Sequence, residues 1–270
     1  MIKKFVFGHP FSTCAVVKDI EKSEGKLPYF TTDGNGNFEY SFSENDIVYG
    51  LGEQARGINK RGWEYVSWNY DNPNHQEDTR SLYGAHNFII VKGTVTFGAF
   101  FDYPGKLVFD IGYTSRNTMK IHAEKNDLTV YIIDGGSEKD IVKQFREIIG
   151  RSYIPPVWAF GYGQSRWGYK NESDVREVAE KYKSAGVPLD SIYLDIDYME
   201  RYKDFTVDTE RFPDLEKLTS DMKADGIHLV PIIDAGVKIE ESYDVYEEGV
   251  ENDYFCKNAE GKDFVGAVWP

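Results

Sequence analysis

Cysteine is scarce in this sequence of 270 residues, and its two cysteines, Cys14 and Cys256, are far apart and form no CxxC pair. This scarcity excludes a disulfide framework and indicates a reducing compartment. Long apolar runs are also absent. Because no run reaches the roughly 18 apolar residues of a membrane-spanning helix, we expect no contact with membrane lipid.

Basic residues are outnumbered, with 31 Lys and Arg against 45 Asp and Glu, which gives a formal net charge of −14. This balance disfavours nucleic acid and anionic membrane surfaces, because both require clustered basic side chains. It leaves neutral sugars as compatible ligands. The start, MIKKFVFGHPFST, lacks the apolar core and the cleavage site of a signal peptide, so we expect a cytoplasmic protein.

Signals for cofactors are weak throughout the chain. Gly161-Tyr162-Gly163 lacks the third glycine of a dinucleotide-binding loop, and the five histidines have no metal-ligand spacing. We therefore expect no cofactor and no metal. The acidic run 244–251 is interpreted as a solvated face.

Residues 1–136 have the pattern of an all-β domain. Phe38, Tyr40 and Phe42 alternate with polar residues after the turn 34–37. Further strands are expected over 88–91, 95–101, 107–111 and 128–133. Short strands at this spacing predict a β-sandwich.

A helix is predicted to follow the sandwich. Ser137 can cap it, and apolar residues from Ile141 to Ile149 form one helical face that ends at Gly150. We place the domain boundary within 137–154, so that the predicted domains are 1–136 and 155–270.

The stretch 154–200 has the pattern strand, loop, helix, strand. Val157–Tyr162 is apolar and rich in strand formers, Ser173 is a plausible helix cap, and Gly186 sits where a helix end requires a left-handed residue. A second strand is expected from Ser191 to Ile196. Two apolar strands joined by a helix indicate parallel pairing, with ligand-binding residues at the carboxyl ends of the strands.

A third unit follows, with a predicted helix around 215–222 and an apolar strand over 228–233 that ends in Asp234. Residues 151–270 thus supply about three βα units, whereas a closed (β/α)8 barrel needs eight and about 250 residues. The predicted fold class is α/β plus β: a sandwich, then the first part of a (β/α)8 TIM barrel. We expect a piece of a longer enzyme.

Three long motifs carry a family resemblance: Ser165-Arg166-Trp167-Gly168-Tyr169, Leu194-Asp195-Ile196-Asp197-Tyr198-Met199, and Phe205 through Phe212-Pro213. In order and spacing they closely resemble glycoside hydrolase family 31, the α-glucosidases and α-xylosidases. The resemblance extends from about Tyr49 to Trp269. It implies an N-terminal galactose-mutarotase-like sandwich next to a catalytic barrel.

The resemblance also implies substrate-binding roles. Asp195 matches an aspartate that binds hydroxyls of the −1 sugar, although its spacing from Asp197 alone fits a glycosidase acid pair. Other positions implied to contact substrate lie at strand ends, in a sandwich loop and at the end of the chain: Asp71, Trp167, Ile196, Ile232, Asp234 and Trp269.

The nucleophile of the family lies in a Trp-x-Asp-Met-Asn-Glu motif, which these residues do not contain. No catalytic residue is therefore assigned. The resemblance implies a retaining α-glycosidase, an α-glucosidase acting on terminal α-linked glucose of oligosaccharides. The chain would supply part of the substrate pocket and would be inactive alone.

Three other interpretations stay open. The chain could be a non-catalytic carbohydrate-binding fragment, which the missing motif favours, or an α-xylosidase of the same family. From the residues alone, Asp195-Ile196-Asp197 could also hold a divalent cation and a nucleotide sugar in a glycosyltransferase. A homo-oligomer is left open.

Overall fold

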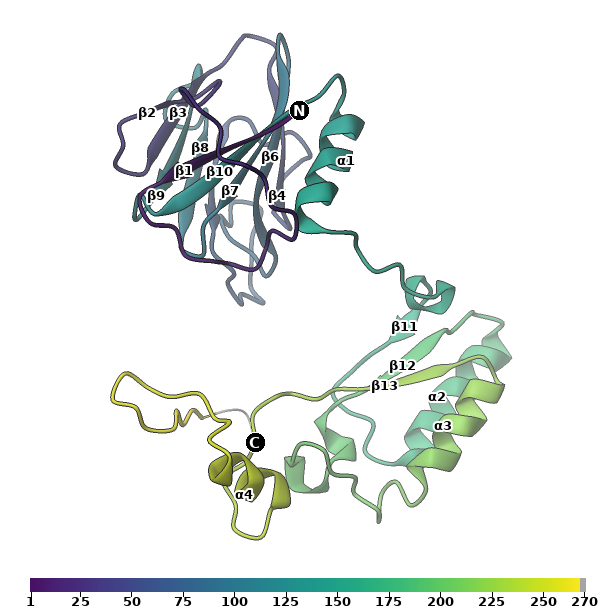
Figure 1. The fold of residues 1–270 in the computed structure, drawn as a ribbon. Helices are drawn as coiled ribbons and strands as arrows, with labels where there is room; N and C mark the ends of the chain where they lie inside the picture. The colour runs from purple at the N-terminus through teal and green to yellow at the C-terminus, as the bar shows by residue number, and fades with distance from the viewer. Residues whose placement is uncertain (268–270) are drawn as a thin grey trace. The chain divides into compact units, whose positions relative to one another are not determined.

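Residues 1–267 are described by a computed structural model of the protein, shown in Figure 1. Trp269, a predicted substrate contact, lies outside these residues. The chain divides at Tyr153 and Ile154 into two units. This division falls inside the predicted boundary segment 137–154, and the two units are described separately below.

The first unit is a sandwich of two antiparallel sheets. One has the strand order β1-β10-β7-β6-β4 and the other has the order β2-β3-β9-β8-β5. The ten strands are β1 (Ile2–Phe7), β2 (Thr31–Thr32), β3 (Asn37–Ser41), β4 (Ile47–Gly52), β5 (Trp63–Ser67), β6 (Ala85–Lys92), β7 (Thr96–Asp102), β8 (Leu107–Ile111), β9 (Thr118–Ala123) and β10 (Leu128–Asp134).

Alternating side chains build the core of this sandwich. In β3, Phe38 and Tyr40 are buried while their neighbours are exposed, as the sequence pattern predicts. These rings meet Phe97 and Phe101 of β7 and Phe109 of β8 in one apolar cluster. The predicted strands are therefore confirmed. Strands β1, β2, β4, β5 and β9 were not predicted from the sequence.

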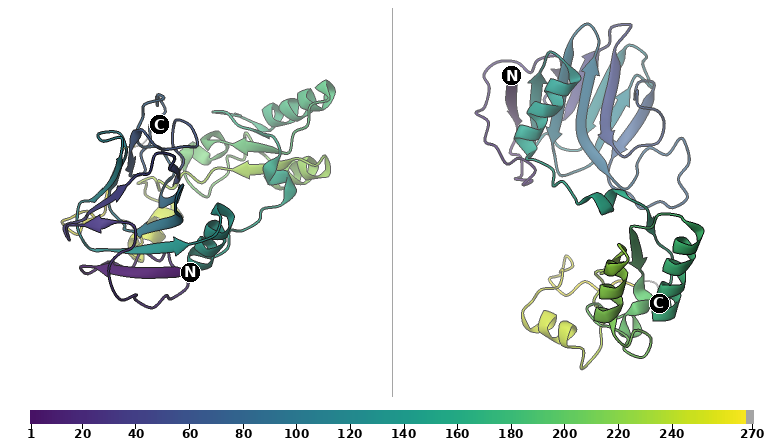
Figure 2. Two further views of the ribbon diagram at one scale, coloured as in Figure 1. Left: turned by 90° about the horizontal axis from the view of Figure 1, so that it is seen from above. Right: turned by 90° about the vertical axis from the view of Figure 1, so that its right-hand side faces the viewer.

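Helix α1 (Glu138–Ile149) packs on the outer face of the first sheet, against β6, β7 and β10. Figure 2 shows it running along these strands. Ser137 caps the helix by accepting the Asp140 amide, as predicted. Ile141 and Ile148 are buried, and the ring of Phe145 stacks on Phe88.

The second unit contains a parallel sheet of three strands, β11 (Gly163–Gln164), β12 (Ser191–Leu194) and β13 (His228–Pro231), with β12 in the middle. Helices α2 (Glu172–Ala185) and α3 (Leu215–Ala224) pack on one side of it, and α4 (Asp244–Glu251) occupies the acidic run (Figure 1). Short 3₁₀ turns are η1 (Val157–Phe160), η2 (Ile196–Tyr198) and η3 (Glu200–Tyr202).

Two predictions for the start of this unit are wrong. Val157–Phe160 forms a 3₁₀ turn, because within residues 1–267 no strand pairs with it and strand propensity alone does not hold an unpaired segment extended. Helix α2 is capped by Asn171, whose side chain accepts the Asp174 amide at 3.0 Å. The Ser173 hydroxyl instead donates to the side-chain oxygen of Asn171, Oδ1.

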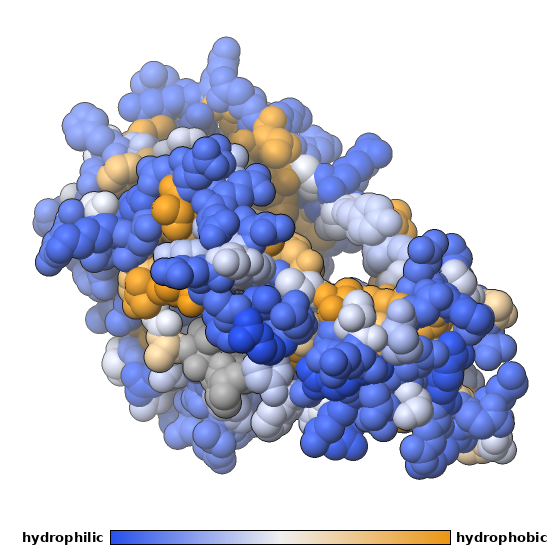
Figure 3. All heavy atoms as spheres, turned by 90° about the horizontal axis from the view of Figure 1, so that it is seen from below, coloured by the Kyte–Doolittle hydropathy of each residue, from blue (hydrophilic) through white to orange (hydrophobic). Residues whose placement is uncertain are grey.

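Gly186 ends α2 in the left-handed region at φ 66°, as predicted. The exposed surface agrees with the charge of the chain, since hydrophilic residues cover most of the face in Figure 3. None of the helices within 1–267 combines the length and the apolar character that crossing a bilayer requires.

We predict that Ile141→Ala will destabilise the first unit by about 2–5 kcal/mol, because the side chain is fully buried between α1 and the sheet. Urea unfolding of the purified chain would measure this change. The control is Val142→Ala on the same helix. Val142 is 42% exposed, so its replacement should stay within about 0.5 kcal/mol of the native value. Equal effects of the two substitutions would contradict the packing described here.

Candidate substrate-binding rim

The segment that follows β12 places Asp195, Ile196 and Asp197 at one edge of the parallel sheet. The strand ends at Leu194, because the Asp195 side chain turns back and accepts the Ile196 amide at 2.8 Å, which starts the 3₁₀ turn η2. Ile196 and Asp197 are buried, and Asp195 is half-buried. The predicted extension of the strand to Ile196 is therefore wrong by two residues.

A cavity of about 190 Å³, which we call the rim cavity, opens beside this turn. Its lining comes from the segments that follow β12 and β13: Ile196, Met199, Tyr202, Asp204, Asp234, Ala235 and Gly236. The structure therefore brings two of the predicted site residues, Ile196 and Asp234, into one hollow. Asp234 adopts a left-handed backbone at φ 53°, which bends the chain around the cavity.

Two hydrogen bonds hold the segments after β12 and β13 together. The Ile232 amide donates to the Leu194 carbonyl at 2.9 Å, which continues the strand pairing by one step. The Tyr198 hydroxyl donates to the Ile232 carbonyl at 2.8 Å. Ile232 thus lies next to the Asp195 turn, and its side chain is partly exposed.

Trp167 follows β11 at the same edge of the sheet, and 68% of its surface is exposed. Its neighbour Gly168 lies directly against the buried carboxylate of Asp197, since a Cβ on residue 168 would stand 1.8 Å from Asp197 Oδ2. The close approach of these two loops therefore requires glycine at this position. Trp167 does not line the rim cavity, and Asp195 does not line it either.

Asp204 is a rim-cavity residue that the sequence analysis missed. It is only 2% exposed, and within residues 1–267 its Oδ2 atom has no hydrogen-bond partner. Burial and the nearby charge of Asp234 both raise the pKa of the Asp204 carboxyl, against one hydrogen bond from the Gly236 amide. Buried carboxylates with raised pKa are typical of functional sites. No pattern in the sequence marks it, because its burial and its proximity to Asp234 arise only in the fold.

The loop that carries Asp204 is anchored on both sides. The Tyr243 hydroxyl donates to the Asp204 carbonyl at 2.5 Å. The ammonium of Lys203 is nearly buried and forms ion pairs with Glu200 at 3.2 Å and with Glu240 at 3.6 Å. Because the Asp204 backbone and its neighbour Lys203 are both held, the Asp204 side chain is fixed in the wall of the cavity.

Asp71 lies in the other unit, in the long loop between β5 and β6, and its side chain is exposed. Partial desolvation and the nearby Asp71 carboxylate raise the pKa of Tyr83, which belongs to the same loop. The role of Asp71 in substrate binding stays a prediction.

No group of three His, Cys, Asp or Glu side chains is placed to hold a metal ion in the part of the chain that the structure describes. Carboxylates, one exposed indole and several apolar side chains gather at the carboxyl edge of the sheet. Carboxylates accept hydrogen bonds from hydroxyl groups, and those bonds are charge-assisted. The chemistry of the rim therefore fits a neutral, hydroxyl-rich ligand.

Comparison with known protein families now assigns both units. Residues 152–270 match the glycosyl hydrolases family 31 TIM-barrel domain, and residues 18–110 match the glycosyl hydrolase 31 N-terminal galactose mutarotase-like domain. The chain belongs to glycoside hydrolase family 31. The predicted fold class is confirmed, with two antiparallel sheets followed by parallel βα units that match the start of the family 31 barrel.

Several α-glucosidases are similar to this chain in sequence. Alpha-glucosidase 2 of Bacillus thermoamyloliquefaciens is 41% identical over 92% of this chain and 32% of its own length. An alpha-glucosidase of Saccharolobus solfataricus is 31% identical over the whole chain and 40% of its own length. The chain thus spans roughly a third of the length of the curated relatives it matches.

A solved structure shares the fold. The glucosidase II alpha subunit in its alpha3-Glc2-bound form matches with a TM-score of 0.77 and 25% identity, over 93% of this chain and 32% of that chain.

We predict that Gly168→Ala will destabilise the second unit by about 1–3 kcal/mol, because the added methyl group collides with the Asp197 carboxylate. Hydrogen exchange of the β12 amides would report this loss. Gly57→Ala is the control, since that glycine has open space around it and no positive φ. Unchanged protection of β12 in Gly168→Ala would show that the two loops do not touch.

We predict that Asp204→Asn will stabilise the chain at neutral pH. Folding raises the pKa of this carboxyl. Its contribution to the free energy of unfolding is therefore fully present below the unfolded pKa of about 3.9, and it is lost as the pH rises through the pKa of the folded state. Asparagine does not titrate and avoids that loss. The gain in melting temperature over the native chain should therefore be largest near pH 7 and shrink toward pH 4.

The control for this substitution is Glu210→Gln, an exposed side chain in the same unit. Its effect on melting temperature should not vary in the same way between pH 4 and pH 7. A lower melting temperature of Asp204→Asn at pH 7 would show that the ionised carboxylate is stabilised in the fold.

Proposed function

We propose that this chain provides the sandwich and the substrate-binding rim of a retaining α-glucosidase that removes terminal α-linked glucose from oligosaccharides. The observation that carries the proposal is the rim itself. In a family 31 chain, Ile196, Asp204 and Asp234 line one cavity at the carboxyl edge of the sheet, next to the turn that begins at Asp195. Both curated relatives described above are α-glucosidases.

The rim supplies recognition and not bond cleavage. A carboxylate such as Asp195 can accept two hydroxyl hydrogen bonds from a sugar ring, and its charge favours an oxocarbenium-like transition state. Apolar side chains at positions 196 and 232 would pack on the ring carbons. The nucleophile motif of the family, Trp-x-Asp-Met-Asn-Glu, does not occur in these 270 residues. We therefore assign no catalytic residue here.

A second candidate function follows from the absence of the nucleophile motif in these 270 residues. Without a nucleophile or a general acid, the 270 residues would act as a carbohydrate-binding unit that does not hydrolyse its ligand. The two candidates share the rim and differ in catalysis alone. Both candidates predict no turnover of p-nitrophenyl α-glucoside by the purified chain, because turnover requires both catalytic carboxylates. Only measurable turnover would decide between them, by excluding the second.

We expect the 270-residue chain to show no turnover of p-nitrophenyl α-glucoside while it binds maltose. Asp195→Ala should weaken maltose binding by about 10- to 100-fold, as expected for the loss of a charged hydrogen bond worth about 1.5–3 kcal/mol. Isothermal titration calorimetry would measure the two affinities.

Glu210→Ala, which removes an exposed carboxylate of the same unit, is the matched control and should bind like the native chain. Equal affinities of Asp195→Ala and the native chain would exclude the role of Asp195. Measurable hydrolysis by the purified chain would exclude the purely binding function.

A further inference from the structure

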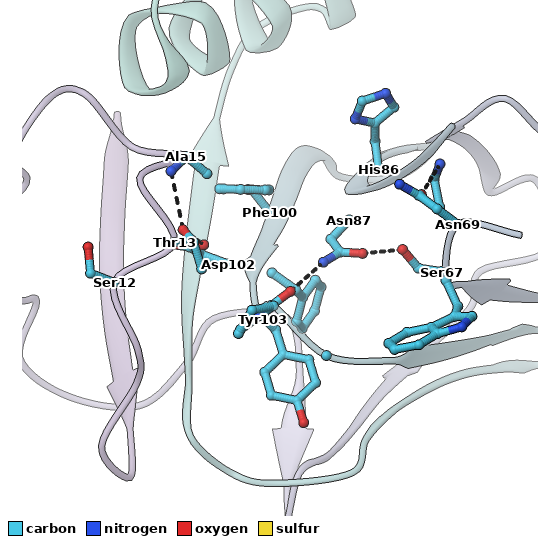
Figure 4. A pocket seen from close by; sticks show the side chains of 15 residues that line it. Ser12, Thr13, Ala15, Ser67, Asn69, His86, Asn87, Phe100, Asp102 and Tyr103 are labelled. Carbon is cyan, nitrogen blue, oxygen red and sulfur yellow. Dashed lines mark hydrogen bonds between the residues drawn. The ribbon is translucent and has the colours of Figure 1, made fainter. Parts of the chain in front are cut away.

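The sandwich has a larger cavity of its own, which we call the sandwich pocket. Its volume is about 690 Å³, within the range of roughly 300–1,000 Å³ that is usual for small-molecule sites. All of its lining residues belong to the first unit. They come from the segment 12–15, the end of β5 with residues 67–69, the start of β6, and the end of β7 with the turn to residue 105 (Figure 4).

Hydrogen bonds already fix the floor of the sandwich pocket. The Asn87 side chain donates to the Tyr103 carbonyl at 3.1 Å, and its oxygen accepts from the Ser67 hydroxyl. Figure 4 shows Asn87 held between these two partners. Phe100 and Phe101, which also line the pocket, are buried. Because these groups are satisfied by the protein, the floor is rigid and a ligand would not have to order it.

The segment 12–15 forms one wall, and a side-chain hydrogen bond attaches it to β7. The Thr13 hydroxyl donates to Asp102 Oδ1 at 2.5 Å and accepts the Ala15 amide at 3.2 Å. No other side chain or amide within residues 1–267 bonds to the Asp102 carboxylate, so Oδ2 is free to accept from a ligand. Asp102 thus presents one acceptor to the pocket.

The opposite wall offers an aromatic surface and further polar groups. The indole of Trp68 is 53% exposed. Asn69 accepts the Ala85 amide at 3.0 Å with its side-chain oxygen, which leaves its amide nitrogen as a donor. The imidazole of His86 is exposed and projects from the start of β6 (Figure 4).

The residues that line the sandwich pocket indicate which class of ligand it could bind. Among the described residues that line it there is no Lys and no Arg, which disfavours phosphates and other anions. Asp102 is the one carboxylate among these residues, which is too few for a metal ion. A purely apolar ligand would leave the Asp102 and Asn69 groups without partners. A neutral molecule with many hydroxyl groups satisfies all of these conditions.

We propose that the sandwich pocket is a second carbohydrate site, in which Trp68 stacks on a glucose unit while Asp102, Asn69 and His86 bond to its hydroxyls. The site stands on the geometry of the first unit, and only the choice of glucose as the sugar rests on the proposed function. It would bind an α-glucan independently of the rim cavity, which belongs to the other unit.

The test is a titration of the ¹⁵N-labelled 270-residue chain with maltotriose, followed by ¹H–¹⁵N correlation spectra. We expect saturable shifts at the amides of residues 67–69, 85–87 and 101–105. Trp68→Ala and Asp102→Asn should each weaken the binding measured at these amides by about tenfold or more, the loss expected for one stacking or charged contact. Inorganic phosphate should shift none of them.

Trp167→Ala is the matched control, because it removes an exposed indole from the other unit and should leave the sandwich shifts unchanged. Where Trp68→Ala does not give a folded spectrum, His86→Ala replaces it, since that side chain is exposed.

Shifts confined to amides of the second unit would overturn the second site and leave the proposed function intact. Shifts at the sandwich amides that survive both Trp68→Ala and Asp102→Asn would also overturn it. Shifts at the sandwich amides alone would support the second site and count against sugar binding at the rim.

Discussion

The pairing of β12 on both of its sides is the constraint on which the candidate site depends. A strand held between β11 and β13 cannot slide, so the residues that follow Leu194 must leave the sheet at one fixed point. Parallel pairing sends the chain after β11 and after β13 to the same edge. Trp167, the Asp195 turn and Ile232 meet at that edge because of this geometry, although more than sixty residues of sequence separate the first from the last.

Buried carboxylates at the rim lower the stability of the fold. The Asp197 carboxylate is buried against a glycine, and Asp204 is buried beside Asp234 with one oxygen unpartnered within residues 1–267. The positive charge in the neighbourhood, on Lys203, is occupied by Glu200 and Glu240. A cavity wall that keeps an unsatisfied acceptor is poorly suited to stability and well suited to a ligand that carries hydroxyl donors.

Periodicity and turn chemistry predicted most of the fold. The Phe38 and Tyr40 alternation, the Ser137 cap and the Gly186 helix end were all readable, because each depends on neighbours in sequence. The 3₁₀ turn at Val157–Phe160 could not be predicted, because a strand requires a pairing partner and no local pattern reveals whether one is present. At the site, Ile196 and Asp234 were named through family resemblance. Asp204 could not be found in that way, since its importance lies in burial and in the proximity of Asp234.

The hydrogen bond from the Tyr198 hydroxyl to the Ile232 carbonyl links the loop that follows β12 to the loop that follows β13. A displacement of either loop is therefore transmitted to the other. On the proposed function, a change of sugar preference would therefore require compensating replacements on both loops.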